Sequence, residues 1–342
     1  MEILMGVTAP GGKLCLLMRQ PEGTEDRSTI LTRIPGADPE WLLQDFNVEF
    51  ASVCATPQAA GNSPFLGLTG EGRVFFIRDG RIVRIPGAGF TLPGSRKLGR
   101  MDNLLVLNNQ LVAMGYGGQA YVSDTGEAWA PIASTFPKAP IEPDTIRFGT
   151  AAYQSKSDRY VFGGEVVIGI SISAGLAEAS RLGDPTQIAA MIRAQARRDY
   201  GALWLLERDA WRDVPLPTND ILDEVVTADG KTVYLRFRVG VVYATQDFVE
   251  LTEVAANSEG LSALGEYRGE ALLADEASIF TLTPTTTEPF EPPLPPMRDR
   301  MLVLSSSDDD LYVIREWSIW RLHAGEWSEV VVPADVVTLG SN

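Results

Sequence analysis

The sequence predicts an all-β fold, a closed ring of similar four-stranded sheets with one helical insertion. Two observations predict it. Pairs of aromatic residues recur at intervals of about 40 residues along the 342-residue chain. Each pair follows two further short, strand-like runs that are separated by Gly, Asp and Asn turns. Four short strands repeated at this spacing are typical of one blade of a β-propeller.

The aromatic pairs set the number of blades. The first members of the pairs are Phe76, Tyr121, Trp204, Tyr243, Phe280 and Trp320. The second members are Trp129, Trp211, Phe248, Phe290 and Trp327. One earlier copy contains Ile30 and Trp41, and one step, from Tyr121 to Trp204, has double length. We therefore expect seven blades, over about 2–46, 49–86, 99–132, 145–214, 222–252, 261–290 and 301–332.

The two ends of the chain are both strand-like, "EILMGV" and "DVVTLG". Open sheet edges invite aggregation, so a propeller has to close. We expect a strand from one end of the chain to complete the blade that the other end begins.

The stretch "SDTGEAW" from Ser123 to Trp129 predicts how the third strand of a blade ends. Asp124 is suited to accept a hydrogen bond from the backbone two residues on, and Gly126 to take a positive φ. Trp129 then opens the outermost strand and covers the neighbouring blade.

This stretch resembles the Asp-box (Asp-x-Gly-x-x-Trp, a BNR-like repeat) of sialidases and many other propellers. Val122 and Ala128 replace the usual Ser and Thr. The resemblance implies a propeller fold and no particular activity. We assign structural roles in the repeat to Tyr121, Asp124, Gly126, Trp129, Trp204, Trp211, Tyr243, Phe248, Trp320 and Trp327.

The double step predicts a helical insertion in blade 4, at about residues 174–200. Asp184 is a good N-cap, Pro185 suits the first turn, and Gln187 completes a capping box. Its basic residues fall near the C-terminal end, where the helix dipole favours cations: Arg193, Arg197 and Arg198. Two interpretations remain open, a decoration on the rim whose arginines pair with nearby carboxylates, or an element that docks a partner.

The links between blades open on the same face as this insertion. Several are long and proline-rich, at 87–97, 133–145 and 291–300. Ordered loops on a rigid scaffold are where binding residues concentrate. We therefore predict a partner-binding face that includes Arg193, Arg197, Arg198, Glu142, Asp144, Arg298 and Asp299.

The composition restricts the partners. The chain has 45 acidic and 29 basic residues, a net charge of −16, which repels nucleic acid and anionic lipid and attracts basic proteins. The N-terminus has no signal-peptide pattern, and no apolar run reaches the roughly 18 residues of a membrane helix. We expect a soluble, cytoplasmic protein with two buried free thiols, Cys15 and Cys54.

Few residues are suited to catalysis or to metal binding. His323 is the only histidine, in a predicted turn, so we expect no metal, cofactor or nucleophilic site. "TRIP" and "VRIP" resemble the Arg-Ile-Pro element of sialidases, but Arg33 and Arg84 fall at the ends of outer strands. Paired carboxylates for glycoside hydrolysis, which stand about 5 to 10 Å apart, stay open among Glu142, Asp144, Asp220, Asp223, Glu224 and Asp299.

The preferred interpretation is a non-enzymatic protein-binding propeller without cofactor, monomeric before it binds. The specific hypothesis is a cytoplasmic immunity protein of bacterial type that neutralises a basic toxin, because acidic charge speeds capture of a basic partner. Two alternatives remain: an enzyme that acts on a carbohydrate or lactone with carboxylates at the central pocket, and a structural subunit of a larger assembly.

Overall fold

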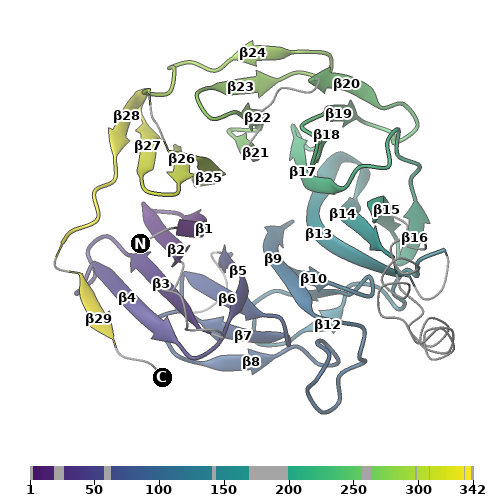
Figure 1. Cartoon of the computed structure of the whole chain (residues 1–342), viewed down its shortest axis with the longest axis horizontal. Helices are drawn as coiled ribbons and strands as arrows, with labels where there is room; N and C mark the ends of the chain where they lie inside the picture. The colour runs from purple at the N-terminus through teal and green to yellow at the C-terminus, as the bar shows by residue number, and fades with distance from the viewer. Residues whose placement is uncertain are drawn as a thin grey trace, which may run out of the picture.

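Seven antiparallel sheets stand around a central axis (Figure 1). The computed structural model describes residues 3–18, 27–57, 63–140, 144–168, 199–255, 263–296, 299–307, 309–334 and 336–339. Each sheet contains four consecutive strands, to which a terminal strand is added in one case, and the predicted blade boundaries agree with the observed ones to within a few residues. The prediction of an all-β, seven-bladed propeller is confirmed.

The first four blades consist of the following strands in chain order. Blade 1 contains β1 (Ile3–Ala9), β2 (Lys13–Met18), β3 (Ser28–Arg33) and β4 (Trp41–Phe46). Blade 2 contains β5 (Phe50–Ala55), β6 (Phe65–Thr69), β7 (Arg73–Phe76) and β8 (Ile82–Arg84). Blade 3 contains β9 (Met101–Leu107), β10 (Gln110–Gly115), β11 (Ala120–Ser123) and β12 (Ala130–Pro131). Blade 4 contains β13 (Thr145–Gln154), β14 (Arg159–Val167), β15 (Tyr200–Glu207) and β16 (Ala210–Asp213), with a 3-10 turn at Ser155–Ser157.

The last three blades and one terminal strand complete the ring. Blade 5 contains β17 (Leu222–Ala228), β18 (Thr232–Phe237), β19 (Val242–Thr245) and β20 (Thr252–Ala255). Blade 6 contains β21 (Ala263–Tyr267), β22 (Glu270–Ala274), β23 (Ile279–Leu282) and β24 (Thr287–Pro289). Blade 7 contains β25 (Met301–Ser307), β26 (Asp310–Arg315), β27 (Ile319–His323) and β28 (Glu326–Glu329), and β29 (Val337–Leu339) follows it.

The first strand of each blade lies nearest the axis, and neighbouring first strands contact one another around the whole ring, including β25 with β1 (Figure 1). Successive strands of a blade run antiparallel. The links between blades and the turns between second and third strands therefore open on one face, called here the upper face. The turns between first and second and between third and fourth strands open on the lower face.

The C-terminal strand joins blade 1 from outside. β29 pairs in parallel with β4, with Val337 opposite Leu42 and Leu339 opposite Gln44. Blade 1 already has four strands from the N-terminal part of the chain. The expectation that one end completes the other's blade was therefore wrong in detail, because the terminal strand adds a fifth strand to a finished sheet.

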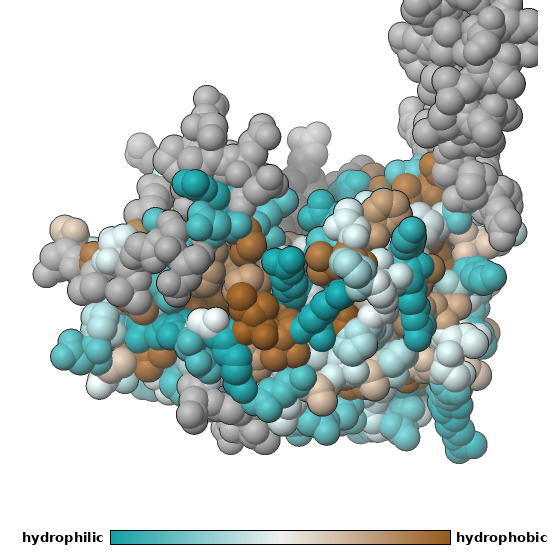
Figure 2. Space-filling view, turned by 90° about the horizontal axis from the view of Figure 1, so that it is seen from below, coloured by the Kyte–Doolittle hydropathy of each residue, from teal (hydrophilic) through white to brown (hydrophobic). Residues whose placement is uncertain are grey.

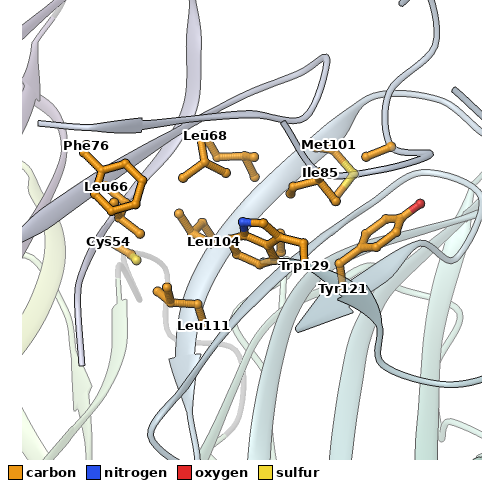
Figure 3. Packing of buried hydrophobic residues seen from close by; sticks show 13 residues of the cluster. Cys54, Leu66, Leu68, Phe76, Ile85, Met101, Leu104, Leu111, Tyr121 and Trp129 are labelled. Atoms are coloured by element: carbon orange, nitrogen blue, oxygen red, sulfur yellow. The ribbon is translucent and has the colours of Figure 1, made fainter. Parts of the chain in front are cut away.

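Apolar side chains fill the space between neighbouring blades, as Figure 3 shows for blades 2 and 3. Leu66 and Phe76 of blade 2 pack in one cluster with Leu111 and Tyr121 of blade 3. Trp129, only 8% exposed, joins the same cluster. This position matches the expected role of Trp129 as a cover over the neighbouring blade.

The turn before Trp129 is held differently from the expectation. The Gly126 N–H donates to Ser123 Oγ at 2.8 Å, and Gly126 has φ of 80°. The Trp129 indole N–H donates to the Gly126 carbonyl at 2.8 Å. The Asp124 carboxylate accepts a hydrogen bond from the Gln110 amide at 2.7 Å. The hydroxyl at the end of the third strand therefore makes the backbone contact that was expected of Asp124.

Blade 5 repeats this turn. The Phe248 N–H donates to Thr245 Oγ1 at 2.9 Å, and Phe248 has φ of 62°. Phe248 is buried in the cluster between blades 4 and 5, and Tyr243 packs there edge-on against Phe237 at 5.7 Å between ring centroids. A hydroxyl residue followed three positions later by a left-handed residue thus recurs in two blades.

Two further tryptophans donate hydrogen bonds to the link that joins their own blade to the preceding one. Trp211 stacks on Phe148 at 5.7 Å and donates its indole N–H to the Thr135 carbonyl at 2.6 Å. Trp327 donates to the Pro292 carbonyl at 3.1 Å. Trp204 and Trp320 are partly buried in the clusters of blades 3–4 and 6–7.

Side chains also accept hydrogen bonds from backbone N–H groups along the free edge of the inner strands. An edge strand leaves backbone N–H groups without a sheet partner. In five places among the described residues a side chain of the preceding blade accepts such a hydrogen bond. These bonds run from Phe50 N to Ser28 Oγ (2.9 Å), from Leu104 N to Ser52 Oγ (3.3 Å), from Val225 N to Thr150 Oγ1 (3.0 Å), from Leu264 N to Glu224 Oε2 (2.7 Å) and from Thr8 N to Ser305 Oγ (3.1 Å).

The predicted helical insertion is not supported. Residues 169–198, which include the expected helix, lie outside the described residues, and the described residues contain no α-helix. Its expected end at 200 was too late, because β15 begins at Tyr200. The Ile168 N–H donates to the Asp199 carboxylate at 2.9 Å, so the chain leaves and re-enters blade 4 at adjacent points of the upper face.

Both cysteines are free and buried, as expected. Burial raises the pKa of the Cys15 and Cys54 thiols well above the usual range. Both therefore remain protonated and serve as small apolar side chains.

We expect Trp129→Ala to lower the free energy of unfolding by about 3 to 5 kcal/mol, because it removes a buried aromatic ring from the contact between blades 2 and 3. Trp317→Ala is the matched control. This residue is 62% exposed, so its loss should change stability by no more than about 0.5 kcal/mol. Urea denaturation followed by fluorescence measures both, and equal losses would refute the packing role of Trp129.

Candidate protein-interaction face

Three large hydrophobic side chains are exposed on loops of the upper face. Phe90 (55% exposed) lies in the link between blades 2 and 3. Val239 (54%) and Trp317 (62%) lie in the turns between second and third strands of blades 5 and 7. Exposed aromatic residues on a rigid scaffold are typical anchors of protein interfaces.

A carboxylate accepts a hydrogen bond from the backbone N–H of each of these residues. Phe90 N donates to Glu71 at 3.2 Å, Val239 N to Asp220 at 2.7 Å, and Trp317 N to Asp299 at 3.2 Å. In each case the carboxylate belongs to another loop of the same face. The backbone that carries each exposed side chain is therefore ordered before any partner arrives.

Glu71 holds the link of blades 2 and 3 most completely. Its Oε2 accepts hydrogen bonds from three successive backbone N–H groups, those of Phe90, Thr91 and Leu92, at 3.2, 2.9 and 3.3 Å. Burial alone would raise the pKa of Glu71, but these bonds outweigh it and hold the pKa below its usual value. The charged form of Glu71 is therefore the form that orders the loop.

Asp299 orders a turn of blade 7 in the same way. Its Oδ2 accepts hydrogen bonds from Trp317 N and, at 2.9 Å, from Ser318 Oγ. Arg315, which is fully buried, donates to the Asp299 carbonyl and, at 2.8 Å, to the Glu276 carbonyl. Burial lowers the pKa of Arg315, although the nearby Asp299 carboxylate opposes this shift.

An ion-pair network joins blades 3 and 4 on the upper face. Arg147 Nε lies 2.6 Å from Asp102, and Arg147 Nη1 lies 2.6 Å from Glu165. The carboxylate side chains are only 9% and 8% exposed. Burial alone would lower the pKa of Arg147, but the hydrogen bonds to both carboxylates outweigh it and raise the pKa. The Tyr116 ring lies 5.5 Å from the same guanidinium.

A pocket of about 700 Å³ lies beside this network, over blade 2. Its walls include Glu49, Glu71, Arg73, Arg100 and Tyr116. The exposed ring of Phe90 stands at the same pocket. Its volume lies within the range of ordinary ligand sites.

The predicted partner-binding residues are placed only in part. Asp144 is buried directly before β13, and Asp299 is half-buried before β25, so they belong to non-adjacent blades of the same face. Five of the predicted residues lie outside the described residues: Glu142, Arg193, Arg197, Arg198 and Arg298.

Three of the six carboxylates that were candidates for glycoside hydrolysis make structural contacts. Asp220 accepts from Val239 N, Asp223 pairs with Arg238 at 3.1 Å, and Glu224 pairs with Arg236 at 2.6 Å. Within the described ranges, no group of three His, Cys, Asp or Glu side chains converges in the way a metal site requires.

Sequence reasoning missed the exposed apolar residues. The sequence analysis placed Phe90 only within a proline-rich link, and Trp317 stands three residues before Trp320, which was assigned to the repeat. An aromatic residue in the tight turn "REWS", outside the repeat position, is the signal that identifies Trp317 as a surface residue.

In the part of the chain that the structure describes, no helix has the length and apolar character needed to span a membrane.

Comparisons with known proteins identify the fold. No protein-family model matches the chain, and no curated protein matches it. Among solved structures, the WD40 β-propeller domain of Doa1 is similar with a TM-score of 0.56 and 9% identity, over 96% of this chain and 93% of that one. YCF48 bound to the D1 peptide has a TM-score of 0.54 and 15% identity, over 98% and 94%.

PorZ of the Porphyromonas gingivalis type-IX secretion system is similar with a TM-score of 0.57 and 13% identity. The match covers 98% of this chain but 38% of PorZ, so the present chain spans well under half of that protein. At these identities the comparisons establish the β-propeller fold. They do not show the Asp-box resemblance.

We expect Arg147→Ala to destabilise the protein by about 2 to 4 kcal/mol, because it leaves two nearly buried carboxylates without their cation. Arg268→Ala, which breaks an exposed pair with Asp309, should cost no more than about 0.5 kcal/mol. Urea denaturation at neutral pH measures both. Similar small losses would show that the network at Arg147 is no stronger than a surface pair.

We expect the amide signals of Phe90, Thr91 and Leu92 to titrate together as Glu71 takes up a proton. Because its pKa is lowered, the carboxylate orders the loop at neutral pH, and this order is lost only as the pH falls below the usual value of 4.5. Nuclear magnetic resonance measures the shifts. Glu71→Ala should abolish the titration, whereas Glu49→Ala should preserve it. An inflection above the usual value would contradict the assignment.

Proposed function

We propose that this protein is a non-enzymatic, protein-binding β-propeller whose partner docks on the upper face. The observation that carries the proposal is the set of three exposed hydrophobic residues, Phe90, Val239 and Trp317, on loops that carboxylates hold in place. Hydrophobic anchors that are ordered beforehand lose little conformational entropy on binding. Hydrophobic anchors on three separate loops fit the surface of a protein partner.

The charge of the chain supports a basic partner. Residues 220–340, which form blades 5 to 7 and the C-terminal strand, contain 22 acidic and 8 basic residues. We call this stretch the acidic arc. Such a field speeds the encounter with a basic protein and repels nucleic acid.

A basic toxin is the specific partner that we propose, which would make this chain a cytoplasmic immunity protein, monomeric before binding. Rapid capture by opposite charge suits a protein that has to neutralise a toxin before it acts. Propellers of similar fold include YCF48, solved with the D1 peptide, and a chain of the Mitotic Checkpoint Complex. These neighbours are consistent with binding of peptides and proteins on this scaffold.

Affinity capture from the native host, with the partner then purified, tests the proposal. Phe90→Ala with Trp317→Ala should weaken partner binding at least about tenfold, because buried aromatic anchors dominate interface energies. Ile82→Ala with Val249→Ala is the matched control, since both residues are exposed away from the upper face. Loss of binding in the control pair alone would overturn the upper-face proposal.

The association rate with the purified partner should fall about tenfold or more as salt rises from about 0.05 to about 0.5 M. A rate that does not depend on salt would remove the basic partner from the proposal. Expression of the partner alone should arrest growth, and this protein should restore it, if the partner is a toxin. Normal growth in the first case would exclude the immunity role.

A further inference from the structure

Blade 2 has a charge opposite to that of the rest of the molecule. Residues 73–100 contain seven basic residues and one acidic residue, Asp79, in a chain whose net charge is −16. We call this stretch the basic segment. In Figure 1 its strands β7 and β8 lie on the far side of the ring from blade 6, which belongs to the acidic arc.

Two arginines of the basic segment face each other across the outer strands of blade 2. Arg73 in β7 is the register partner of Arg84 in β8. Directly opposed residues of an antiparallel pair have Cβ atoms about 5 Å apart, and like charges there are destabilising. Arg73 is the first residue of β7 and Arg84 is the last residue of β8. Both positions therefore lie next to the upper face.

Neither arginine is neutralised by the described residues. Arg73 and Arg84 are both exposed and form no ion pair within the described part of the chain. Other arginines of the segment do have partners: Arg81 pairs with Asp79 and Glu127, and Arg100 lies 3.3 Å from Asp102. Arg78, Arg96 and Lys97 likewise form no ion pair with a described residue, so the opposed pair is one part of the uncompensated positive charge of the basic segment.

One member of the opposed pair, Arg73, belongs to the wall of the 700 Å³ pocket, and Arg84 is its register partner on β8. Arg100 lines the same pocket, and its side chain is 51% exposed. One of the two carboxylates of the wall, Glu71, is already engaged by three backbone N–H groups. The other, Glu49, is exposed and forms no ion pair with a described residue. Together with Arg84, the register partner of Arg73, two guanidinium groups without an ion pair to a described residue stand near one such carboxylate, Glu49.

We propose that this pocket and the opposed arginines form a subsite for an acidic peptide segment of the partner. Paired guanidinium groups bind carboxylates through directed, charge-assisted hydrogen bonds. A bound carboxylate removes the repulsion between Arg73 and Arg84, which gives a physical reason for keeping two like charges in register. The inference rests on the proposed function, since the segment belongs to the docked protein.

The subsite also fixes the orientation of the partner. The basic segment lies across the ring from blade 6, at the middle of the acidic arc (Figure 1). A partner with a basic surface and an acidic segment can place both against their complements in one orientation, and the reversed orientation sets like charges together. Figure 2 views the ring from the side of blade 2, where hydrophilic side chains surround a hydrophobic patch.

Nucleic acid is the competing occupant of paired arginines. The acidic arc, with 22 acidic and 8 basic residues, repels a phosphate backbone over the rest of the face. A short acidic peptide fits the observations better, because it need extend no farther than blade 2.

Binding of labelled hexaglutamate, measured by fluorescence anisotropy at low salt, tests the proposal without the natural partner. Arg73→Glu with Arg84→Glu should weaken binding at least about tenfold, because it replaces both cations by anions. Arg208→Glu with Arg212→Glu is the matched control, with the same change of charge at exposed sites of blade 4. The control pair should bind within about twofold of the unaltered protein.

Three results would overturn the proposal. They are no saturable binding by the unaltered protein, equal losses in the two double variants, and tighter binding of a hexathymidylate DNA of similar charge. None of them bears on whether the host partner docks through Phe90 and Trp317, so the subsite and the proposed function fail separately.

The stability of the free protein gives a second readout. Arg84→Gln should raise the melting temperature by about 1 °C, because it removes the repulsion from Arg73, and it should weaken hexaglutamate binding. A lower melting temperature would show that Arg84 makes a structural contact and would overturn the proposed subsite.

Discussion

Each blade buries one face of its sheet against the next blade, and the contacts between the seven blades have to close a circle. Apolar side chains supply most of this contact, as Leu66, Phe76, Leu111 and Trp129 do between blades 2 and 3. Among the described residues, side chains of the preceding blade satisfy inner-strand N–H groups at five of the seven boundaries. Because the ring is closed, loops far apart in the sequence are held at fixed positions on one face.

The acidic residues of this chain have two separate roles. Some carboxylates, such as Glu71, Asp220 and Asp299, accept backbone hydrogen bonds and order the loops that carry exposed hydrophobic residues. Others create the field of the acidic arc. The first role gives these three carboxylates a structural function, and the second supports the proposed basic partner.

The sequence predicted the ring because the aromatic residues that pack between blades repeat at the spacing of the blades themselves. It did not predict which hydroxyl or carboxylate holds a given turn, since Ser123 and Asp124 are equally able to accept the bond at Gly126. Nor did it identify Phe90 and Trp317, because exposure depends on the packing of neighbouring loops. The pairing of Arg73 with Arg84 depends on register, which a short edge strand such as β8 fixes only in the folded sheet.

Hydrogen exchange of the protein with and without its captured partner tests the central claim, that function resides on the upper face, most directly. The account predicts slower exchange on binding at the upper-face turns 70–72, 238–241 and 316–318. It also predicts no change at the lower-face turns 10–12, 229–231 and 324–325. Protection confined to the lower-face turns would contradict it.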